Sequence, residues 1–250
     1  MRAYLYDPTG NMTVLVEGEV SAEERRTVAD GLMARCPEAE QLGFLSGGRE
    51  GCDIRLDMAG GEFCGNAAMC AAAHFARTHG GGDRLVTVSV SGEEKPLQVR
   101  LEQRADGFAG RVHMPLPLSV EEVRLGEHTL PLVRFAGISH LISDGILARQ
   151  EAEENIRRWC AQLGADCLGV MLYDRLRGQL APLVYVANID TLFWENSCAS
   201  GSAAVGVWLY AREGKSVSAS FSEPGGVLAA ECDGENLILR GSVRLKYEIE

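Results

Sequence analysis

Short runs of apolar or alternating residues make up most of the chain, and they predict many β-strands. In the first part of the chain these runs are residues 3–7, 13–17, 43–45, 53–58, 85–91, 97–103 and 108–114. Two longer segments have helical spacing instead. Residues 21–36 begin with Ser21 and Glu24, a capping box that satisfies amide donors at a helix start, and an alanine-rich run over 66–79 ends at three glycines.

The second part of the chain repeats this order of elements. Residues 121–143 are rich in strand patterns, and residues 151–164 predict an amphipathic helix that Gly164 closes. A second helix of small residues runs to about Glu213 and stops at Gly214. The remaining predicted strands are residues 167–174, 180–189, 216–222, 227–232, 237–241 and 242–249.

Two cysteine turns mark this internal repeat. The stretch "GGEFCGNAAMC" places Cys64 in front of the first small-residue helix, and "WENSCASGSAA" places Cys198 in front of the second, 134 residues later (198 − 64). The strand runs "VTVSVSG" from 86 and "VSASFSE" from 217 repeat at an offset of 131 (217 − 86). A long fixed offset indicates two copies of one supersecondary unit.

We therefore predict an α/β (α+β) fold of two pseudo-symmetric lobes. Each lobe is expected to be a mixed or antiparallel sheet wrapped around a central helix, with the active site in the cleft between the lobes. The predicted N-terminal lobe is residues 1–112, completed by a C-terminal strand over about 242–250, and the predicted C-terminal lobe is residues 113–241.

Composition and charge argue against several classes of partner and ligand. A net charge of −11 without a dense run of Lys or Arg argues against nucleic-acid and anionic-membrane partners. The chain starts without a signal-like segment and has no apolar run near the roughly 20 residues of a membrane span, so we predict a cytoplasmic protein. The eight cysteines form no Cys-x-x-Cys pair and have no neighbouring histidine cluster, so we predict no structural metal.

A thiol in front of a helix has a specific chemical environment. Helix N-termini carry unpaired amide donors and partial positive charge, so they bind anions and favour a thiolate with a lowered pKa. One such thiol could be a nucleophile, a redox sensor or a base. Two thiols on opposite faces of a carbon could remove a proton from one face and deliver one to the other, while the helix amides bind an α-carboxylate. No nucleotide or pyridoxal motif is present, so we predict no cofactor.

At these residues the chain resembles the diaminopimelate epimerase superfamily of cofactor-independent two-cysteine racemases. It is most similar to the histidine racemase branch, which supplies D-histidine for opine metallophores. The resemblance implies a diaminopimelate-epimerase-like fold and racemisation of an amino acid without pyridoxal phosphate, with histidine as the expected substrate. Besides the two cysteine turns, the shared segments are "DPTGNMTVLV" (7–16), "EQLGFL" (40–45), "GISHLI" (137–142), "PLVYVANI" (182–189) and "EPGGVL" (223–228).

The resemblance also implies the site residues. Cys64 and Cys198 would be the acid/base pair, and the substrate would contact residues on both sides of each cysteine. The implied substrate-binding residues are Asn11, Glu40, Gln41, Gly65, Asn66, His140, Glu195, Ala199 and Ser200. Plainer roles stay open for three of them, because His140 could be a buried core histidine, Glu40 a loop end and Asn11 part of an ordinary turn.

Two departures from the superfamily pattern bear on the substrate. Diaminopimelate epimerases carry a longer, glycine-rich loop before the second cysteine, with an arginine that pairs with the distal carboxylate. Here only Asn196 and Ser197 separate Glu195 from Cys198. An arginine–carboxylate pair is hard to replace, so the sequence favours a side chain that is cationic or carries hydrogen-bond donors. The second departure is Ala199, where the family has glycine, so the turn must accommodate a β-carbon.

The sequence is also compatible with other functions. The same chemistry could act on another amino acid, diaminopimelate included. A non-catalytic binding protein of the same fold and a redox sensor are further alternatives, as is a carbon-shifting isomerase like the phenazine-pathway relatives, although those relatives lack the cysteine pair. The expected partner is a small amino-acid substrate, and a homodimer is compatible with the sequence, which does not determine the oligomeric state.

Overall fold

The chain forms two compact units. The computed structural model describes residues 1–249, so Glu250, the end of the predicted C-terminal strand, lies outside the described residues. The first unit consists of Met1–His113 together with the residues from Arg240 onward, and the second is Met114–Leu239. Within residues 1–249 no helix is long and apolar enough to cross a membrane.

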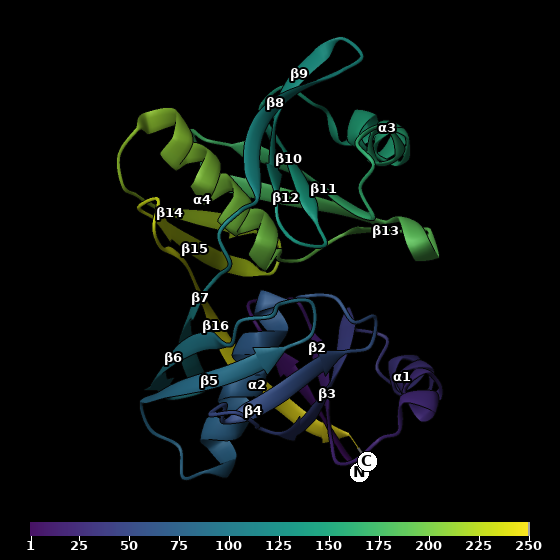
Figure 1. Cartoon of the computed structure of the whole chain (residues 1–250), viewed down its shortest axis with the longest axis vertical. Coiled ribbons are helices and arrows are strands. Elements are labelled where there is room, and N and C mark those ends of the chain that lie inside the picture. The colour runs from purple at the N-terminus through teal and green to yellow at the C-terminus, as the bar shows by residue number, and fades with distance from the viewer. Residues whose placement is uncertain (250) are drawn as a thin grey trace. The chain divides into compact units, whose positions relative to one another are not determined.

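The first unit is a sheet closed around one helix. Its strands follow the order β1-β2-β3-β4-β5-β6-β7-β16, and β1 pairs with β16 to close the sheet. Figure 1 shows the sheet enclosing helix α2 and the two chain ends lying together. The bounds are β1 Arg2–Asp7, β2 Thr13–Glu17, α1 Ala22–Arg35, β3 Gln41–Gly47, β4 Ile54–Met58, α2 Gly65–Thr78, β5 Arg84–Val90, β6 Leu97–Arg104, β7 Gly107–His113 and β16 Leu237–Ile249.

Small side chains allow α2 to occupy the centre of this sheet. The helix packs against β2, β4, β5, β6 and β7, and 11 of its 14 residues are buried. Six alanines keep its diameter small, so the strands can approach from several directions. Where the longer Met69 projects, β7 has Gly110, and a β-carbon there would lie 3.0 Å from the Met69 sulfur. Close contact with the surrounding strands therefore fixes the helix within the sheet.

The second unit repeats this plan with an extra hairpin. Its strand order is β16-β15-β14-β12-β11-β10-β9-β8, and β13 pairs with β12. Helix α4 packs on β9, β10, β11, β14 and β15, whereas α3 covers β11 and β12, and Figure 1 shows the two helices on opposite sides of these central strands. The bounds are β8 Ser119–Leu125, β9 His128–Arg134, β10 Ser139–Asp144, α3 Arg149–Gln162, β11 Cys167–Asp174, β12 Gln179–Val186, a short 3₁₀ helix Ala187–Ile189, β13 Thr191–Trp194, α4 Ala199–Glu213, β14 Val217–Glu223 and β15 Gly226–Cys232.

Strand pairing shows the internal repeat directly. In the first unit β2 and β3 are parallel, β3 and β4 are antiparallel, and β4 and β5 are parallel. In the second unit the corresponding pairs β10–β11, β11–β12 and β12–β14 have the same directions. Each central helix lies in the connection between the last two strands of its series, and in the second unit this connection also contains β13. The predicted α/β (α+β) fold with a sheet around a central helix in each unit is thus confirmed.

One local prediction is confirmed, and two others differ from the structure. The capping box forms as predicted, because the Glu24 carboxylate accepts the Ser21 amide N–H at 3.3 Å. The strand predicted over 180–189 was wrong at its end, since Ala187–Ile189 is a 3₁₀ helix. Asp190 then adopts a left-handed conformation with φ 46°, which turns the chain into β13 and forms a hairpin that the apolar pattern did not predict. The two strands predicted over 237–249 are one strand, β16.

Candidate active site

Each of the two predicted cysteines is the N-cap residue of a central helix. Cys64 precedes α2 with φ −139° and ψ 113°, and Cys198 precedes α4 with φ −126° and ψ 105°. Each sulfur accepts the backbone N–H three residues later, from Ala67 and from Gly201, at 3.4 Å in both cases. The same local geometry therefore occurs twice, and each sulfur lies where helix amides point outward.

In the first unit a chain of hydrogen bonds links Cys64 to a carboxylate. The Cys64 thiol donates to the Gln41 side-chain oxygen at 3.0 Å. The Gln41 amide nitrogen donates to the Asn11 side-chain oxygen at 2.5 Å, and the Asn11 amide nitrogen donates to a Glu40 oxygen at 3.0 Å. Four residues that the sequence assigned to the site are thus directly connected. Each of these three hydrogen bonds is donated in the same direction, from Cys64 toward Glu40.

A fifth residue, which the sequence analysis missed, fixes the direction of this chain. The Gln41 amide nitrogen also donates to the Thr13 hydroxyl at 2.9 Å. Since Thr13 in turn donates to the Asn11 backbone carbonyl at 3.0 Å, its oxygen is left to accept from Gln41. This arrangement points the Gln41 oxygen at Cys64. Thr13 belongs to the "GNMT" segment near the start of the chain, but nothing in a lone threonine indicated this contact.

The remaining predicted residues of the first unit lie in the first turn of α2. Gly65 and Asn66 directly follow the cap, and both are buried. Cys70 lies further along the same helix and is fully buried, as predicted for a core residue. Burial raises the pKa of the Cys70 thiol, and the nearby Cys64 raises it further, so Cys70 remains a neutral thiol.

In the second unit a buried histidine approaches Cys198 through a serine. The Ser200 hydroxyl lies 3.7 Å from the Cys198 sulfur and 3.0 Å from Nε2 of His140. His140 lies on β10 opposite Gly169, where a β-carbon would come within 2.2 Å of the ring. Burial lowers the pKa of His140 to about 3, so its imidazole is neutral at physiological pH. It therefore orients the Ser200 hydroxyl without adding charge.

Two carboxylates lie close to Cys198. Glu195 follows β13, and Glu223 ends β14, where it accepts the Cys198 amide N–H at 2.8 Å. Burial raises the pKa of the Cys198 thiol well above its usual range, and the negative charges of Glu195 and Glu223 raise it further. The lowered thiol pKa expected from the helix terminus is therefore wrong for Cys198. Desolvation and two neighbouring acids outweigh the amide of Gly201, which acts in the opposite direction.

Ala199 occupies the first position of α4 and is buried. The backbone φ angle of Ala199 is not positive, so its β-carbon fits the right-handed start of the helix. Replacement of the family's glycine by alanine therefore introduces no backbone strain here. Ser200 and Ala199 together form the first turn behind the Cys198 cap. Among residues 1–249, no group of three or more His, Cys, Asp or Glu side chains could hold a metal ion.

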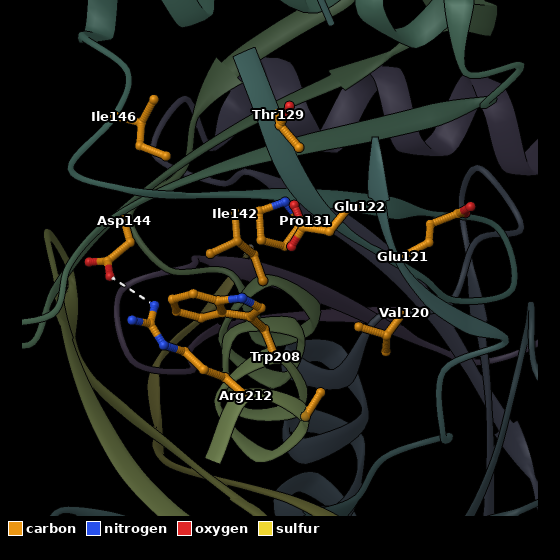
Figure 2. A pocket seen from close by; sticks show the side chains of 11 residues that line it. Val120, Glu121, Glu122, Thr129, Pro131, Ile142, Asp144, Ile146, Trp208 and Arg212 are labelled. Carbon is orange, nitrogen blue, oxygen red and sulfur yellow. Dashed lines mark ion pairs between the residues drawn. The ribbon is translucent and has the colours of Figure 1, made fainter. Parts of the chain in front are cut away.

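The second unit also contains a cavity of about 610 Å³ outside this site. Figure 2 shows that it is lined by strands and by the far end of α4, where Arg212 forms an ion pair with Asp144 beside Trp208. Trp208 follows Cys198 by ten residues, which is about 15 Å along a helix. The cavity lining contains none of the predicted site residues, so the candidate site is the helix start and not this cavity.

Comparisons with known proteins find relatives that match most of the chain. Residues 4–246 match the family described as the histidine racemase CntK N-terminal domain. A histidine racemase from Fusobacterium nucleatum is 30% identical over 255 aligned positions, covering 97% of this chain and 93% of that protein. A histidine racemase from Staphylococcus aureus is 32% identical and covers 88% of this chain and 84% of that protein.

Solved structures share the fold at low sequence identity. A predicted epimerase from Pseudomonas aeruginosa superposes with a TM-score of 0.77 at 13% identity, covering 100% of this chain and 98% of that chain. A probable proline racemase from Agrobacterium radiobacter gives a TM-score of 0.69 at 12% identity, covering 100% and 92%. Both similarities therefore concern the architecture of the chain.

The Gln41 contact predicts a measurable change in Cys64. Replacement of Gln41 by glutamate places a carboxylate against the thiol, which should raise the pKa of Cys64 by at least about one unit because a like charge disfavours the thiolate. The measurement is the pH dependence of iodoacetamide alkylation at Cys64, followed by peptide mass spectrometry. Gln98→Glu is the matched control, since Gln98 contacts Thr87 and not a cysteine. Equal alkylation profiles for Gln41→Glu and the unmodified protein would show that the contact has no influence on the thiol.

Proposed function

From its membership of the histidine racemase CntK N-terminal domain family, we propose that this chain, an isomerase of the racemase class, interconverts L- and D-histidine without a cofactor. In this proposal Cys64 and Cys198 are the two catalytic residues. One takes the α-proton from the substrate, and the other delivers a proton to the opposite face of the same carbon. The rest of each helix start binds the substrate and stabilises the charge that develops.

The repeated N-cap geometry is the observation that supports this proposal most strongly. A cysteine in front of one buried helix is readily explained by packing. Two cysteines with matching backbone angles, each with its sulfur 3.4 Å from the amide of the third helical residue, are better explained by a common chemical task. Inversion of a carbon by two bases requires one proton-transfer group for each face, and a duplicated fold can provide two such groups.

The proposed reaction balances without any additional reactant. A thiolate sulfur forms a bond to the α-hydrogen, the bond between carbon and hydrogen breaks, and its electron pair moves onto the α-carbon and into the carboxylate. The thiol of the second cysteine then gives its proton to the opposite face, which leaves a thiolate there. After one turnover the first cysteine is a thiol and the second is a thiolate. The starting protonation state returns either when the opposite enantiomer reacts next or when the two cysteines exchange protons with solvent.

The groups around each sulfur support the difficult deprotonation in different ways. First-turn amides of α2 and α4 can donate to the substrate carboxylate, and one well-placed donor contributes about 2.7–4 kcal/mol to a transition state. A thiol whose pKa is raised by burial, as for Cys198, becomes a stronger base once it has lost its proton. The cationic α-ammonium group of an amino acid offsets the negative charges of Glu195 and Glu223.

Histidine is favoured as the substrate by the charges near the predicted binding residues. Glu40 and Glu195 are carboxylates suited to the donor nitrogens of an imidazole, and the arginine that a second substrate carboxylate requires is replaced by the short Asn196–Ser197 connection. The similarity to two histidine racemases supports the same assignment. The nearest rivals are the same reaction on another amino acid and a binding protein without activity.

Loss of either cysteine should abolish racemisation. Cys64→Ser and Cys198→Ser are each expected to lower kcat for L-histidine by at least about 10²–10⁴-fold, because a hydroxyl is a far weaker base than a thiolate at the same position. Chiral chromatography of the product mixture measures this loss. Cys52→Ser and Cys232→Ser are controls of similar burial in the two units and should retain activity. Full activity in either catalytic variant would contradict the two-base proposal.

The substrate assignment has its own test. In a panel of L-amino acids and diaminopimelate, kcat/KM is expected to be greatest for histidine and at least about 100-fold lower for diaminopimelate, because an unpaired buried carboxylate is costly. Glu40→Gln should raise KM for histidine, whereas Glu38→Gln, which changes a carboxylate bonded to Tyr247, should not. If diaminopimelate is turned over in preference to histidine, the assignment of histidine as the substrate is wrong. If no amino acid is turned over, the protein is a binding protein of the same fold and not a racemase.

A further inference from the structure

One buried acid next to Cys198 has no part in the proposed proton transfers. Glu223 ends β14 and begins the "EPGGVL" segment, yet only 6% of its surface is exposed. Its two carboxylate oxygens contact two positions of α4. One accepts the Cys198 amide N–H at 2.8 Å, and the other accepts the Ser202 hydroxyl, which is also fully buried. Glu223 thus bridges the helix cap and the next turn.

The first contact completes a capping box from a distant part of the chain. In an ordinary capping box the carboxylate that accepts the N-cap amide belongs to the third helical residue. In α4 that residue is Gly201, where a β-carbon would lie 2.2 Å from the Met171 sulfur and 3.1 Å from the Cys198 sulfur. A glutamate side chain has no space there. Glu223 supplies the carboxylate from the neighbouring strand instead.

The internal repeat shows that this contact belongs to one half of the molecule. At the strand offset of 131, Glu223 corresponds to Gly92 (223 − 131), and at the helix offset of 134, Ser202 corresponds to Ala68 (202 − 134). A β-carbon at Gly92 would lie 2.4 Å from the Phe63 amide nitrogen, so no side chain fits in the first unit. The equivalent positions Gly92 and Ala68 therefore cannot form this pair, which is particular to the Cys198 cap.

We propose that Glu223 is a positioning residue that holds the Cys198 cap and sets, through its own charge, the pH range in which the Cys198 thiol releases its proton. This inference rests on the proposed catalytic role of Cys198. It adds a residue that acts through the cysteine and does not touch the substrate.

The hydrogen bonds allow Glu223 to change charge without releasing the cap. When the carboxylate is ionised, it accepts from both the Cys198 amide and the Ser202 hydroxyl. When it is protonated, its O–H donates to the Ser202 oxygen, because a hydroxyl can reverse its role, while the other oxygen still accepts from Cys198. Protonation thus alters the electrostatic field at the sulfur and leaves its position unchanged.

The burial of Glu223 and the groups around it place this change of charge near physiological pH. Burial, with a smaller contribution from the charge of Glu195, raises the pKa of Glu223 to about 8, although the hydrogen bonds from Ser202 and Cys198 oppose the rise. His140, which approaches through Ser200, is neutral, as described above. An ionised Glu223 beside Cys198 disfavours the thiolate, and a neutral Glu223 removes that penalty.

Glu223→Gln separates the charge from the contacts. Its side-chain oxygen can accept from Cys198 and its amide can donate to Ser202, so the cap remains and the charge is lost. We expect the Cys198 thiolate to form at a pH lower by at least about half a unit, a roughly threefold change in ionisation equilibrium. The readout is the ultraviolet thiolate absorbance of Cys198, obtained as the difference between each protein and the same protein carrying Cys198→Ser. Exposed Glu235→Gln is the control and should show no shift.

Activity provides a second readout. In the direction in which Cys198 takes the proton, the acidic limb of the rate profile should move to lower pH in Glu223→Gln. Glu223→Ala, which loses both contacts, should turn over at least about tenfold more slowly than Glu223→Gln, because a displaced catalytic group loses its alignment. Ser202→Ala provides a milder variant: without the hydroxyl, Glu223 stays neutral to higher pH, so the Cys198 titration should move in the same direction.

The outcomes distinguish this inference from the proposed function. If the unmodified protein racemises no amino acid, the proposed function fails, and the absorbance titration still decides whether Glu223 controls Cys198. If the titration curves of Cys198 coincide in Glu223→Gln, Ser202→Ala and the unmodified protein, the inference is overturned even when the enzyme is fully active. Equal loss of activity in the Gln and Ala variants without a change in pH profile would also overturn it, since that pattern indicates a purely structural role.

Discussion

The amide-to-sulfur hydrogen bond at the start of each central helix is the constraint on which the rest of the structure depends. It requires the N-cap cysteine to adopt an extended conformation and its helix to begin at a defined point. In the first unit a closed sheet around an alanine-rich helix holds that point in place, and in the second the strands packed on α4 do so. The sheets therefore do more than bury apolar surface, because they fix the two sulfur atoms with respect to the first-turn amides of their helices.

The two halves share a backbone but differ in the polar groups that face the sulfur. Cys64 donates to a neutral amide at the head of a chain that ends on Glu40, whereas Cys198 lies beside Glu195, Glu223 and a neutral imidazole reached through Ser200. A duplicated fold thus gives two equivalent positions with different electrostatic environments. This difference suits a reaction in which one cysteine must act as the acid while the other acts as the base, since their proton affinities need not be equal.

The sequence predicted the features that depend on local contacts. The capping box of Ser21 and Glu24, the glycine at the end of α4 and the two cysteine turns each involve residues close together in the chain. It could not predict contacts that the fold creates between distant residues. Thr13 meets Gln41 across 28 positions, and Glu223 meets Cys198 across 25. The raised pKa of Cys198 follows from burial and from the charges of Glu195 and Glu223. The helix-terminus argument was sound for an exposed thiol, but it took no account of desolvation.

The most direct test of the two-cysteine account is the fate of the α-hydrogen in D₂O at low conversion. Starting from L-histidine, the account predicts D-histidine that carries one deuterium at the α-carbon, while the unreacted L-histidine keeps its hydrogen. The mirror result is expected from D-histidine, because each cysteine serves one face of the carbon. Deuterium appearing equally in substrate and product from the outset would indicate a single base, and no deuterium in either would contradict proton transfer at the α-carbon altogether.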